Sequence, residues 1–226
     1  MRALLISQDP DEAAILSLIL QRAGMAVNRS TDLEHALQNQ PESPADLILL
    51  AMPAGSPLVQ VRMIRAQTET PLVLVAEQIE EAVHALLLES GADLVVTRPF
   101  GARLLISQLR ALLRRAAGLP FFTLPTLSIS DLTLDPATRT VQIGNQGPKR
   151  LTQLEFRLLY ALMIHRSQVL PAEILVEQVW GYTGEGERDL VRGLIRRLRA
   201  KVEPDPSQPR FILTIPGIGY TFDPQD

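Results

Sequence analysis

The chain has 226 residues, which suits two domains of about a hundred residues each, and its 46% of hydrophobic residues can fill two cores. It contains no cysteine, which excludes disulfide bonds and thiol chemistry and suits the reducing cytoplasm, where we expect the protein to work. The formal net charge of −3 excludes a uniformly basic chain, and no apolar run approaches the about 18 residues that cross a bilayer, so we expect no membrane partner.

The first part of the chain alternates short apolar runs with segments of helical spacing. Continuous apolar runs are typical of parallel strands that are buried on both faces. The runs lie at Leu4–Ser7, Leu47–Leu50, Pro71–Val75 and Leu94–Thr97, with a weaker candidate at Val27–Arg29. The helical segments lie at Asp11–Ala23, Asp32–Gln38, Val59–Gln67, Glu80–Glu89 and Ala102–Arg115. This alternation predicts an α/β domain over residues 1–118 with a doubly wound, five-stranded parallel sheet, whose functional crevice lies at the carboxyl ends of the strands.

The pattern changes after residues 119–126, a segment with two prolines that we interpret as a linker. The next expected elements are an antiparallel sheet over Leu127–Ile143, a helix from Thr152, a helix over Ala172–Val179 and a terminal hairpin around Pro216–Gly219. The start of the first of these helices has a specific signal, because Thr152 and Glu155 have the spacing of a capping box.

A strongly basic helix is predicted between the Gly-rich segment 181–186 and the hairpin. The stretch LVRGLIRRLRAKV, Leu190–Val202, has five Arg or Lys residues and no acid. At 100° per residue, Arg192, Arg196 and Arg199 fall on one face and an apolar stripe falls on a neighbouring face. Such a helix can bury one side and lay the other into a nucleic-acid groove, although a solvated face or internal ion pairs are the alternatives. With the other elements it predicts a winged helix-turn-helix domain over residues 127–226.

The whole chain resembles the OmpR/PhoB family of response regulators. The stretches that carry the resemblance in the second half are LTQLEFRLLYAL, EILVEQVWG, LVRGLIRRLRAKVEPDPSQPR and ILTIPGIGY. Those in the first half are ALLISQD, ADLILLA, PLVLVA and GADLVVTRPF. The resemblance implies a CheY-like receiver domain followed by a winged-helix domain that binds double-stranded DNA. The implied function is a sequence-specific transcription regulator, and segment 181–186, with Glu185 and Glu187 near it, matches the region where relatives touch RNA polymerase.

The resemblance also implies roles in DNA binding. Arg192 and Arg196 are the candidates for base edges, since Arg commonly pairs with guanine. The implied contacts to the DNA backbone come from Arg197, Arg199, Lys201, Thr214 and Tyr220. Three positions depart from the family pattern. Pro216 stands at the hairpin tip where many relatives have Arg, Asp189 stands where a basic or polar residue is usual, and Gly193 stands on the groove side in the middle of the basic helix.

The phosphorylation pocket that the resemblance implies is degenerate. Receivers accept a phosphoryl group on an Asp at the end of the third strand, and the matching residues of the pocket here are Gln8, Asp9, Ala51, Ala76 and Arg98. A methyl group is neither nucleophile nor ligand, so Ala51 excludes the usual aspartyl phosphate. Asp9 is better interpreted as a helix N-cap before Pro10 than as a metal ligand. The alternative interpretation of Arg98 is a solvated cation that lies near Asp9. The resemblance implies a cis peptide bond between Arg98 and Pro99.

Receivers of this family dimerise through the fourth helix, fifth strand and fifth helix. The candidate dimer face here is unusually apolar and comprises Val83, Leu86, Leu87, Leu94, Leu104 and Gln108. A helix cannot bury three consecutive apolar residues against one sheet, so the runs Leu86–Leu88 and Leu104–Ile106 predict a second buried surface. We expect a constitutive homodimer, with an isolated apolar patch or another partner as the alternative.

Enzymatic function is not expected. The sequence contains no evident pairing of a nucleophile with a base and no nucleotide-binding loop, and His35, His84 and His165 lack the spacing of metal ligands, so neither metal nor cofactor is expected. The predicted function is a DNA-binding transcription regulator that works without phosphorylation. The alternative is an interaction module, in which the receiver remnant binds a protein or small ligand and DNA binding is secondary.

Overall fold

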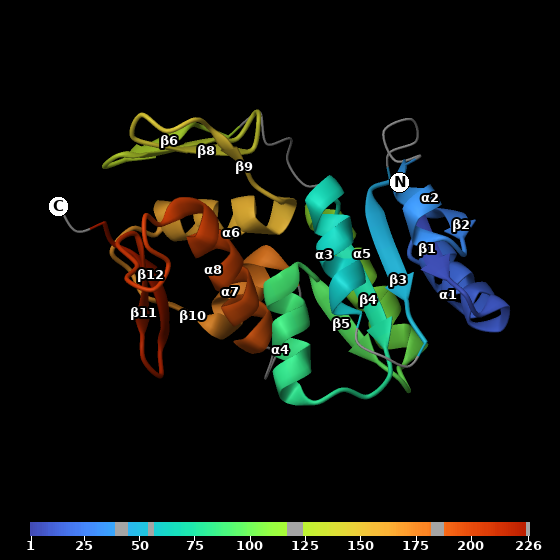
Figure 1. Ribbon diagram of the computed structural model, residues 1–226. Coiled ribbons are helices and arrows are strands. Elements are labelled where there is room, and N and C mark those ends of the chain that lie inside the picture. Colours follow the sequence, from blue (N-terminus) through green and yellow to red (C-terminus); the bar gives the residue numbers. More distant parts are fainter. Residues whose placement is uncertain (39–44, 54–56, 117–123, 182–187, 225–226) are drawn as a thin grey trace. The chain divides into compact units, whose positions relative to one another are not determined.

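The computed structural model describes residues 1–38, 45–53, 57–116, 124–181 and 188–224 (Figure 1). It divides into two compact units, Met1–Ala116 and Ala117–Asp226. Most of the predicted linker 119–126 lies outside the described residues. Along the parts of the chain that are described, no helix is both long and apolar enough to cross a membrane.

The first unit is built on a five-stranded parallel sheet with the order β2-β1-β3-β4-β5, which confirms the predicted fold. The strands are β1 (Arg2–Ser7), β2 (Ala26–Ser30), β3 (Leu47–Ala51), β4 (Leu72–Ala76) and β5 (Leu94–Thr97). The helices are α1 (Pro10–Arg22), α2 (Leu33–Gln38), α3 (Leu58–Gln67), α4 (Glu81–Ser90) and α5 (Ala102–Ala116). Strands β3 and β4 are buried throughout, whereas the edge strand β2 is mostly exposed, and this difference explains its weaker sequence signal.

Right-handed crossovers place helices on both faces of this sheet. The chain moves in one direction from β1 to β2 and in the other from β2 through β3 and β4 to β5, so α1 lies on the face opposite α2, α3 and α4. Contacts agree with this arrangement, because α1 packs beside α5, and α3 packs beside both α2 and α4. The carboxyl ends of β1, β3 and β4 therefore meet at one edge of the sheet.

A buried ion pair holds α3 to the start of β5. The guanidinium of Arg65 binds the Asp93 carboxylate at 2.5 Å and also donates to the carbonyl oxygens of Gly91 at 2.7 Å and Thr70 at 2.6 Å. The Asp93 side chain is only 1% exposed and accepts a second hydrogen bond, from the backbone N–H of Leu72 at 2.9 Å. The pair therefore joins one helix to the beginnings of two strands.

The second unit is the predicted winged helix-turn-helix. An antiparallel sheet of β6 (Leu127–Ile129), β7 (Leu132–Asp135), β8 (Thr140–Ile143) and β9 (Lys149–Arg150) comes first. Three helices follow, α6 (Gln153–Ile164), α7 (Ala172–Val179) and α8 (Arg188–Val202). The second sheet has the order β10-β12-β11, with β10 (Leu170–Pro171), β11 (Ile212–Ile215) and β12 (Gly219–Phe222).

The predicted capping box at the start of α6 is confirmed. The Thr152 hydroxyl accepts a hydrogen bond from the Glu155 N–H at 3.3 Å, and the Glu155 carboxylate accepts one from the Thr152 N–H at 2.8 Å. The helix itself begins one residue later than expected, at Gln153. The two-residue strands β9 and β10 were not predicted, because they exist only through pairing with β8 and β12.

Candidate nucleic-acid interface

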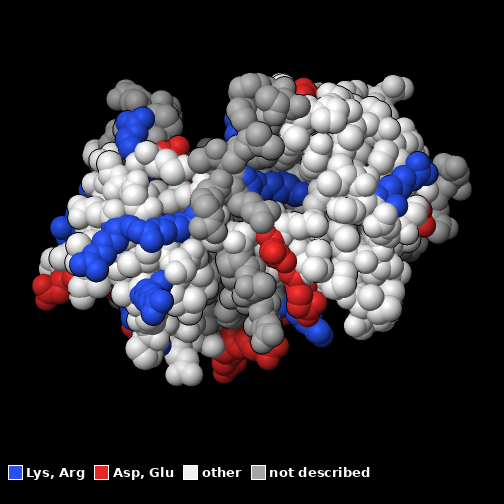
Figure 2. All heavy atoms as spheres, turned by 180° about the vertical axis from the view of Figure 1, so that it is seen from behind, with Lys and Arg blue, Asp and Glu red and all other residues white. Residues whose placement is uncertain are grey.

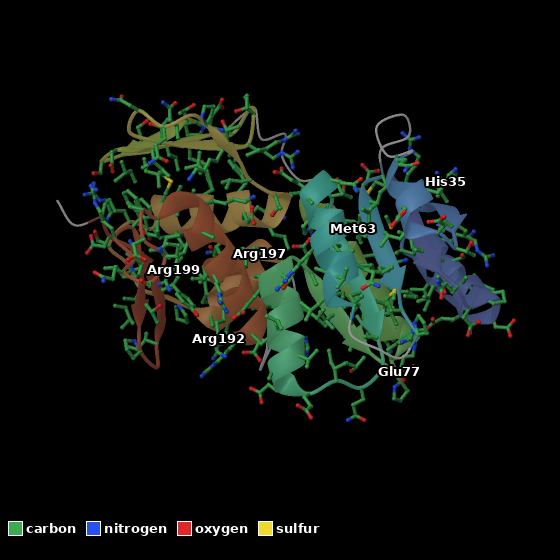
Figure 3. The ribbon with its side chains drawn as sticks, in the orientation of Figure 1. His35, Met63, Glu77, Arg192, Arg197 and Arg199 are labelled. Carbon is green, nitrogen blue, oxygen red and sulfur yellow. The ribbon has the colours of Figure 1, made fainter. Side chains whose placement is uncertain are left out.

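Helix α8 has the two faces that its sequence predicts. Its apolar face packs against α6 and α7, and Val191, Ile195, Leu198 and Val202 are at most 2% exposed. Arg192 and Arg196 remain exposed, and Figure 3 shows Arg192 projecting from the helix. Arg197 is partly buried. The buried face fixes the helix in the unit, so the exposed arginines project from a rigid support.

Arg192 forms an ion pair with Asp189, one helical turn earlier. Their side chains meet at 2.9 Å, and the Arg192 side chain is 62% exposed. Asp189 lies in the first turn of α8, where the helix dipole favours an acid. Exposed pairs of this kind contribute about 0–1 kcal/mol, so Arg192 can exchange this partner for another at little cost.

Arg199 is more buried than its place on the same helical face as Arg192 and Arg196 suggests. Its Nε and Nη2 atoms donate to the carbonyl oxygen of Ile212 at 3.1 and 2.7 Å, and Nη2 also donates to the Thr214 hydroxyl at 2.9 Å. Burial lowers the pKa of Arg199, and the nearby Glu203 and Tyr220 oppose this shift. The guanidinium thus holds strand β11 against α8, a function that helical spacing alone did not predict.

Tyr220 lies beside the same arginines. Burial raises the pKa of the Tyr220 phenol, and the charges of Arg192 and Arg199 oppose the rise, so the phenol is neutral at neutral pH and keeps its O–H donor. The structure therefore brings together Arg192 and Arg199 of α8, Thr214 of β11 and Tyr220 of β12.

Lys201 does not join this group. Its ammonium binds the Glu155 carboxylate at 2.8 Å and the carbonyl oxygen of Arg150 at 3.0 Å, and its side chain is 31% exposed. Lys201 therefore completes the capping network of α6. A contact of Lys201 with phosphate stays a prediction, in which this ammonium would have to keep or exchange these partners.

The anchor of the hairpin is Glu203, a residue that the sequence did not single out. Its side chain is buried just after α8, and its carboxylate accepts hydrogen bonds from the backbone N–H groups of Arg210 at 2.8 Å, Phe211 at 3.0 and 3.1 Å, and Ile212 at 2.8 Å. An acid that follows a basic helix is ordinary in sequence, so no local signal could have identified this role.

Figure 2 shows, from behind, the Lys and Arg side chains of the described residues of each unit. In this view most described residues are uncharged, and the Lys and Arg side chains form small groups, including one elongated run on the first unit (Figure 2). Phosphate backbones are bound by clustered cations, and the candidate interface is the face of α8 that carries its exposed arginines.

Comparisons with known proteins agree with this architecture. Residues 146–222 match the family described as "Transcriptional regulatory protein, C terminal". The DNA-binding response regulator MtrA of Mycolicibacterium smegmatis is 37% identical over 226 residues, which span 99% of this chain and 97% of that protein. The chain belongs to the OmpR/PhoB family of response regulators. KdpE of Escherichia coli, a KDP operon transcriptional regulatory protein, is 34% identical over 94% of this chain and 96% of its own.

Solved structures support the same assignment for the fold. A structure of a RitR mutant matches with a TM-score of 0.78 and 25% identity, over 99% of both chains. The first unit of this OmpR/PhoB-family member is accordingly its receiver domain. The segment expected to meet RNA polymerase, with Glu185 and Glu187, lies largely outside the described residues.

An open pocket of ≈ 650 Å³ lies at the carboxyl edge of the receiver sheet. It is lined by Ser7, Gln8, Asp9, Glu12, Ala51, Pro53, Glu77 and Arg98. Four of the five predicted pocket positions therefore come together, whereas Ala76 is buried at the end of β4 and is not in this lining. Among the residues that the structure describes, no group of His, Asp and Glu could hold a metal ion.

Asp9 is the N-cap of α1, as its sequence context favoured. Its carboxylate accepts hydrogen bonds from the N–H groups of Asp11 at 2.9 Å and Glu12 at 3.1 Å, and Pro10 is the first residue of the helix. This carboxylate is therefore occupied by a structural role, which leaves it poorly suited to bind a cation.

Arg98 is paired, which corrects its interpretation as a solvated cation near Asp9. It forms two hydrogen bonds with the Glu12 carboxylate, at 2.6 and 2.7 Å, and lies 3.6 Å from the Glu77 carboxylate, which Figure 3 labels. The hydrogen bond with Glu12 raises the pKa of Arg98, and burial opposes this shift. The bond from Arg98 to Pro99 is cis, as the resemblance implied.

The candidate dimer face is only partly exposed. Leu86 and Leu104 are 37% and 63% exposed, and Val83 and Gln108 are partly buried. Leu87 and Leu94 were wrongly assigned to this face, because they are 0% and 5% exposed and belong to the core. One leucine of each consecutive run thus remains exposed, whereas Leu87, Leu88 and Leu105 pack into the core.

Proposed function

We propose that this OmpR/PhoB-family member is a transcription regulator that recognises a specific duplex DNA sequence through α8. One observation carries the proposal: a rigid helix buries its apolar face on α6 and α7 while Arg192 and Arg196 stay exposed beside a hairpin. Recognition helices of helix-turn-helix proteins lie in the major groove in this manner. Support also comes from MtrA and KdpE, which are similar along nearly the whole chain and are described as a DNA-binding and a transcriptional regulator. We assign the protein to the cytoplasm, where chromosomal DNA and RNA polymerase meet.

Within this proposal the polar groups have distinct roles. Arg192 and Arg196 read base edges, and Arg197 and the Nη1 group of Arg199 contact phosphate. Thr214 and Tyr220 support the DNA backbone from the hairpin. Asp189 lowers the affinity for DNA, because its carboxylate competes with DNA for Arg192 and repels phosphate.

The Arg192→Ala variant tests this assignment. We expect it to lower the preference for the selected sequence over random duplex by about 1–3 kcal/mol, or roughly 5- to 150-fold, because a bidentate contact to guanine is lost. The measurement is fluorescence anisotropy with both duplexes over a salt series, after selection of binding sites from genomic DNA with the full chain.

Two variants on the same helix serve as controls. Arg188→Ala removes a similarly exposed arginine that pairs with Glu173 at 3.2 Å, and it should leave the preference unchanged. Asp189→Asn should tighten binding to both duplexes. An equal loss on specific and random DNA in Arg192→Ala would show that Arg192 contacts phosphate only.

We further propose that the receiver works without phosphorylation. One support is Ala51, which stands at the end of β3. The other is that the neighbouring carboxylates already have partners, since Asp9 caps α1 and Glu12 binds Arg98. With acetyl phosphate or beryllofluoride and Mg²⁺, we expect neither a covalent adduct by intact mass spectrometry nor a change in DNA affinity. Detection of an acyl phosphate in residues 1–116 would overturn this part of the proposal.

The receiver is proposed to form a constitutive homodimer through Leu86 and Leu104. Leu104→Glu should shift the full chain toward monomer in concentration-series ultracentrifugation, because a charge cannot be buried unpaired in an apolar interface. Val59→Glu is the matched control, since Val59 is 67% exposed on α3, outside this face. A wild-type chain that is monomeric at tens of micromolar would contradict the proposal.

The second candidate function is an interaction module. The pocket at the sheet edge favours it, because its volume of ≈ 650 Å³ lies in the range of about 300–1,000 Å³ that is usual for small-molecule sites. This candidate predicts weak DNA binding without sequence preference, so the same site selection separates the two.

A further inference from the structure

The tip of the hairpin is apolar and carries no positive charge. From Phe211 to Asp226 the sequence contains neither Lys nor Arg. The tip comprises Pro216, Gly217 and Ile218, all of them exposed, and Ile218 is 59% exposed. A hairpin of this composition cannot bind DNA by neutralising phosphates, so any contact that it makes must be of another kind.

The tip is also rigid. The Ile218 N–H donates to the carbonyl oxygen of Ile215 at 3.1 Å, and Gly217 between them has a φ of +75°. This is the arrangement of a type II turn with Pro at its second position. Such a turn loses little conformational entropy when it is inserted into a partner.

The strands behind the tip are fixed on both sides. Strand β11 is held by the hydrogen bonds from Arg199 and to Glu203. Strand β12 begins at Gly219, which is paired with Pro171 and so close to the Leu170 carbonyl that a side chain would not fit. The exposed Ile218 side chain is therefore presented by a hairpin that is held on both strands, two residues before Tyr220.

We propose that Ile218, backed by Pro216, inserts as an apolar wedge between base steps of the minor groove. This inference rests on the proposed function, in which α8 occupies the adjacent major groove. The four-residue strands of the hairpin, at about 3.4 Å per residue, hold the tip roughly 14 Å from the start of β11. Aliphatic side chains and proline are the groups that such wedges use to unstack and kink a duplex.

Duplex DNA is the favoured binding partner of the hairpin tip, because the tip continues the surface that carries Arg192, Thr214 and Tyr220. A wedge at this place adds a preference that hydrogen bonds do not provide. Pyrimidine–purine steps such as TA and CA unstack most easily, so one of them is expected beside the bases read by α8.

The test compares Ile218→Ser with the wild-type full chain on the selected duplex and on random duplex. We expect the wild type to bend the selected duplex in a FRET or circular-permutation assay and Ile218→Ser to abolish the bend. Affinity for the selected duplex should fall about 10- to 100-fold, in line with the burial of one aliphatic side chain. The slope of affinity against salt should stay unchanged, since no phosphate contact is lost.

Ile164→Ser is the matched control, because Ile164 is 53% exposed at the end of α6, and it should bind and bend DNA like the wild type. If the wild type binds the selected duplex without bending it, or if Ile218→Ser keeps full affinity, the wedge is wrong while the proposed function stands. A wild-type chain that binds no duplex overturns both.

Discussion

Replacement of Glu203 by alanine is expected to lower the free energy of unfolding of the second unit by about 3–5 kcal/mol, because it leaves several buried N–H groups without an acceptor. The carboxylate accepts hydrogen bonds from the backbone N–H groups of three consecutive residues, Arg210, Phe211 and Ile212. Because Glu203 directly follows α8, these bonds connect the end of this helix to the hairpin. Trp180, the single tryptophan of the chain, is 1% exposed in this unit. Its fluorescence during urea unfolding provides the measurement.

Loss of DNA affinity should accompany this loss of stability, since the hairpin would no longer be held at a fixed place beside α8. Glu203→Gln keeps one acceptor oxygen and should have an intermediate effect. Glu177→Ala, in an exposed position of α7, should change stability by less than about 0.5 kcal/mol. An unfolding midpoint of Glu203→Ala equal to that of the wild type would contradict the anchoring role.

The second large effect is expected for Asp93→Ala in the receiver. The change leaves the Arg65 guanidinium, with a side chain only 12% exposed, without its counter-charge, and removes the acceptor of the Leu72 N–H. Removing one partner of a buried ion pair costs about 3–5 kcal/mol. Urea unfolding followed by far-UV circular dichroism should reveal the shift, with the Trp180 transition as an internal reference for the other unit.

Asp46→Ala is the matched control for this variant. Asp46 is exposed and accepts one hydrogen bond, from the Arg2 N–H at 2.7 Å, so its loss should cost about 1 kcal/mol or less. If Asp93→Ala and Asp46→Ala shift the unfolding curve equally, the Arg65–Asp93 pair does not have the structural weight assigned to it.

Local patterns predicted most of the fold. The apolar runs became β1, β3, β4 and β5, and the capping signals of Asp9 and Thr152 identified the starts of α1 and α6. These features succeed because helix caps and the burial of a strand on both faces depend on residues close together in the chain. The strands β9 and β10 escaped prediction because two residues carry no periodicity.

The candidate site was predicted less completely. Helical spacing correctly separated the buried and exposed faces of α8, yet it placed Arg192 and Arg199 on the same exposed face. Arg199 instead binds Ile212 and Thr214 on the hairpin, and Lys201 binds Glu155 on α6. Their partners lie 13 to 46 positions away in the chain, so no helical wheel could identify them.

The sequence by itself determined the class of both domains, the apolar face of α8 and the absence of an acid at Ala51, because these follow from residue types and their spacing. Only the tertiary structure decided which leucines of the 86–88 and 104–106 runs stay exposed, which cations remain at the surface, and how Glu203 braces the hairpin. The physical reason is that burial and hydrogen-bond partners depend on which distant segments pack together, whereas secondary structure depends mainly on neighbours along the chain.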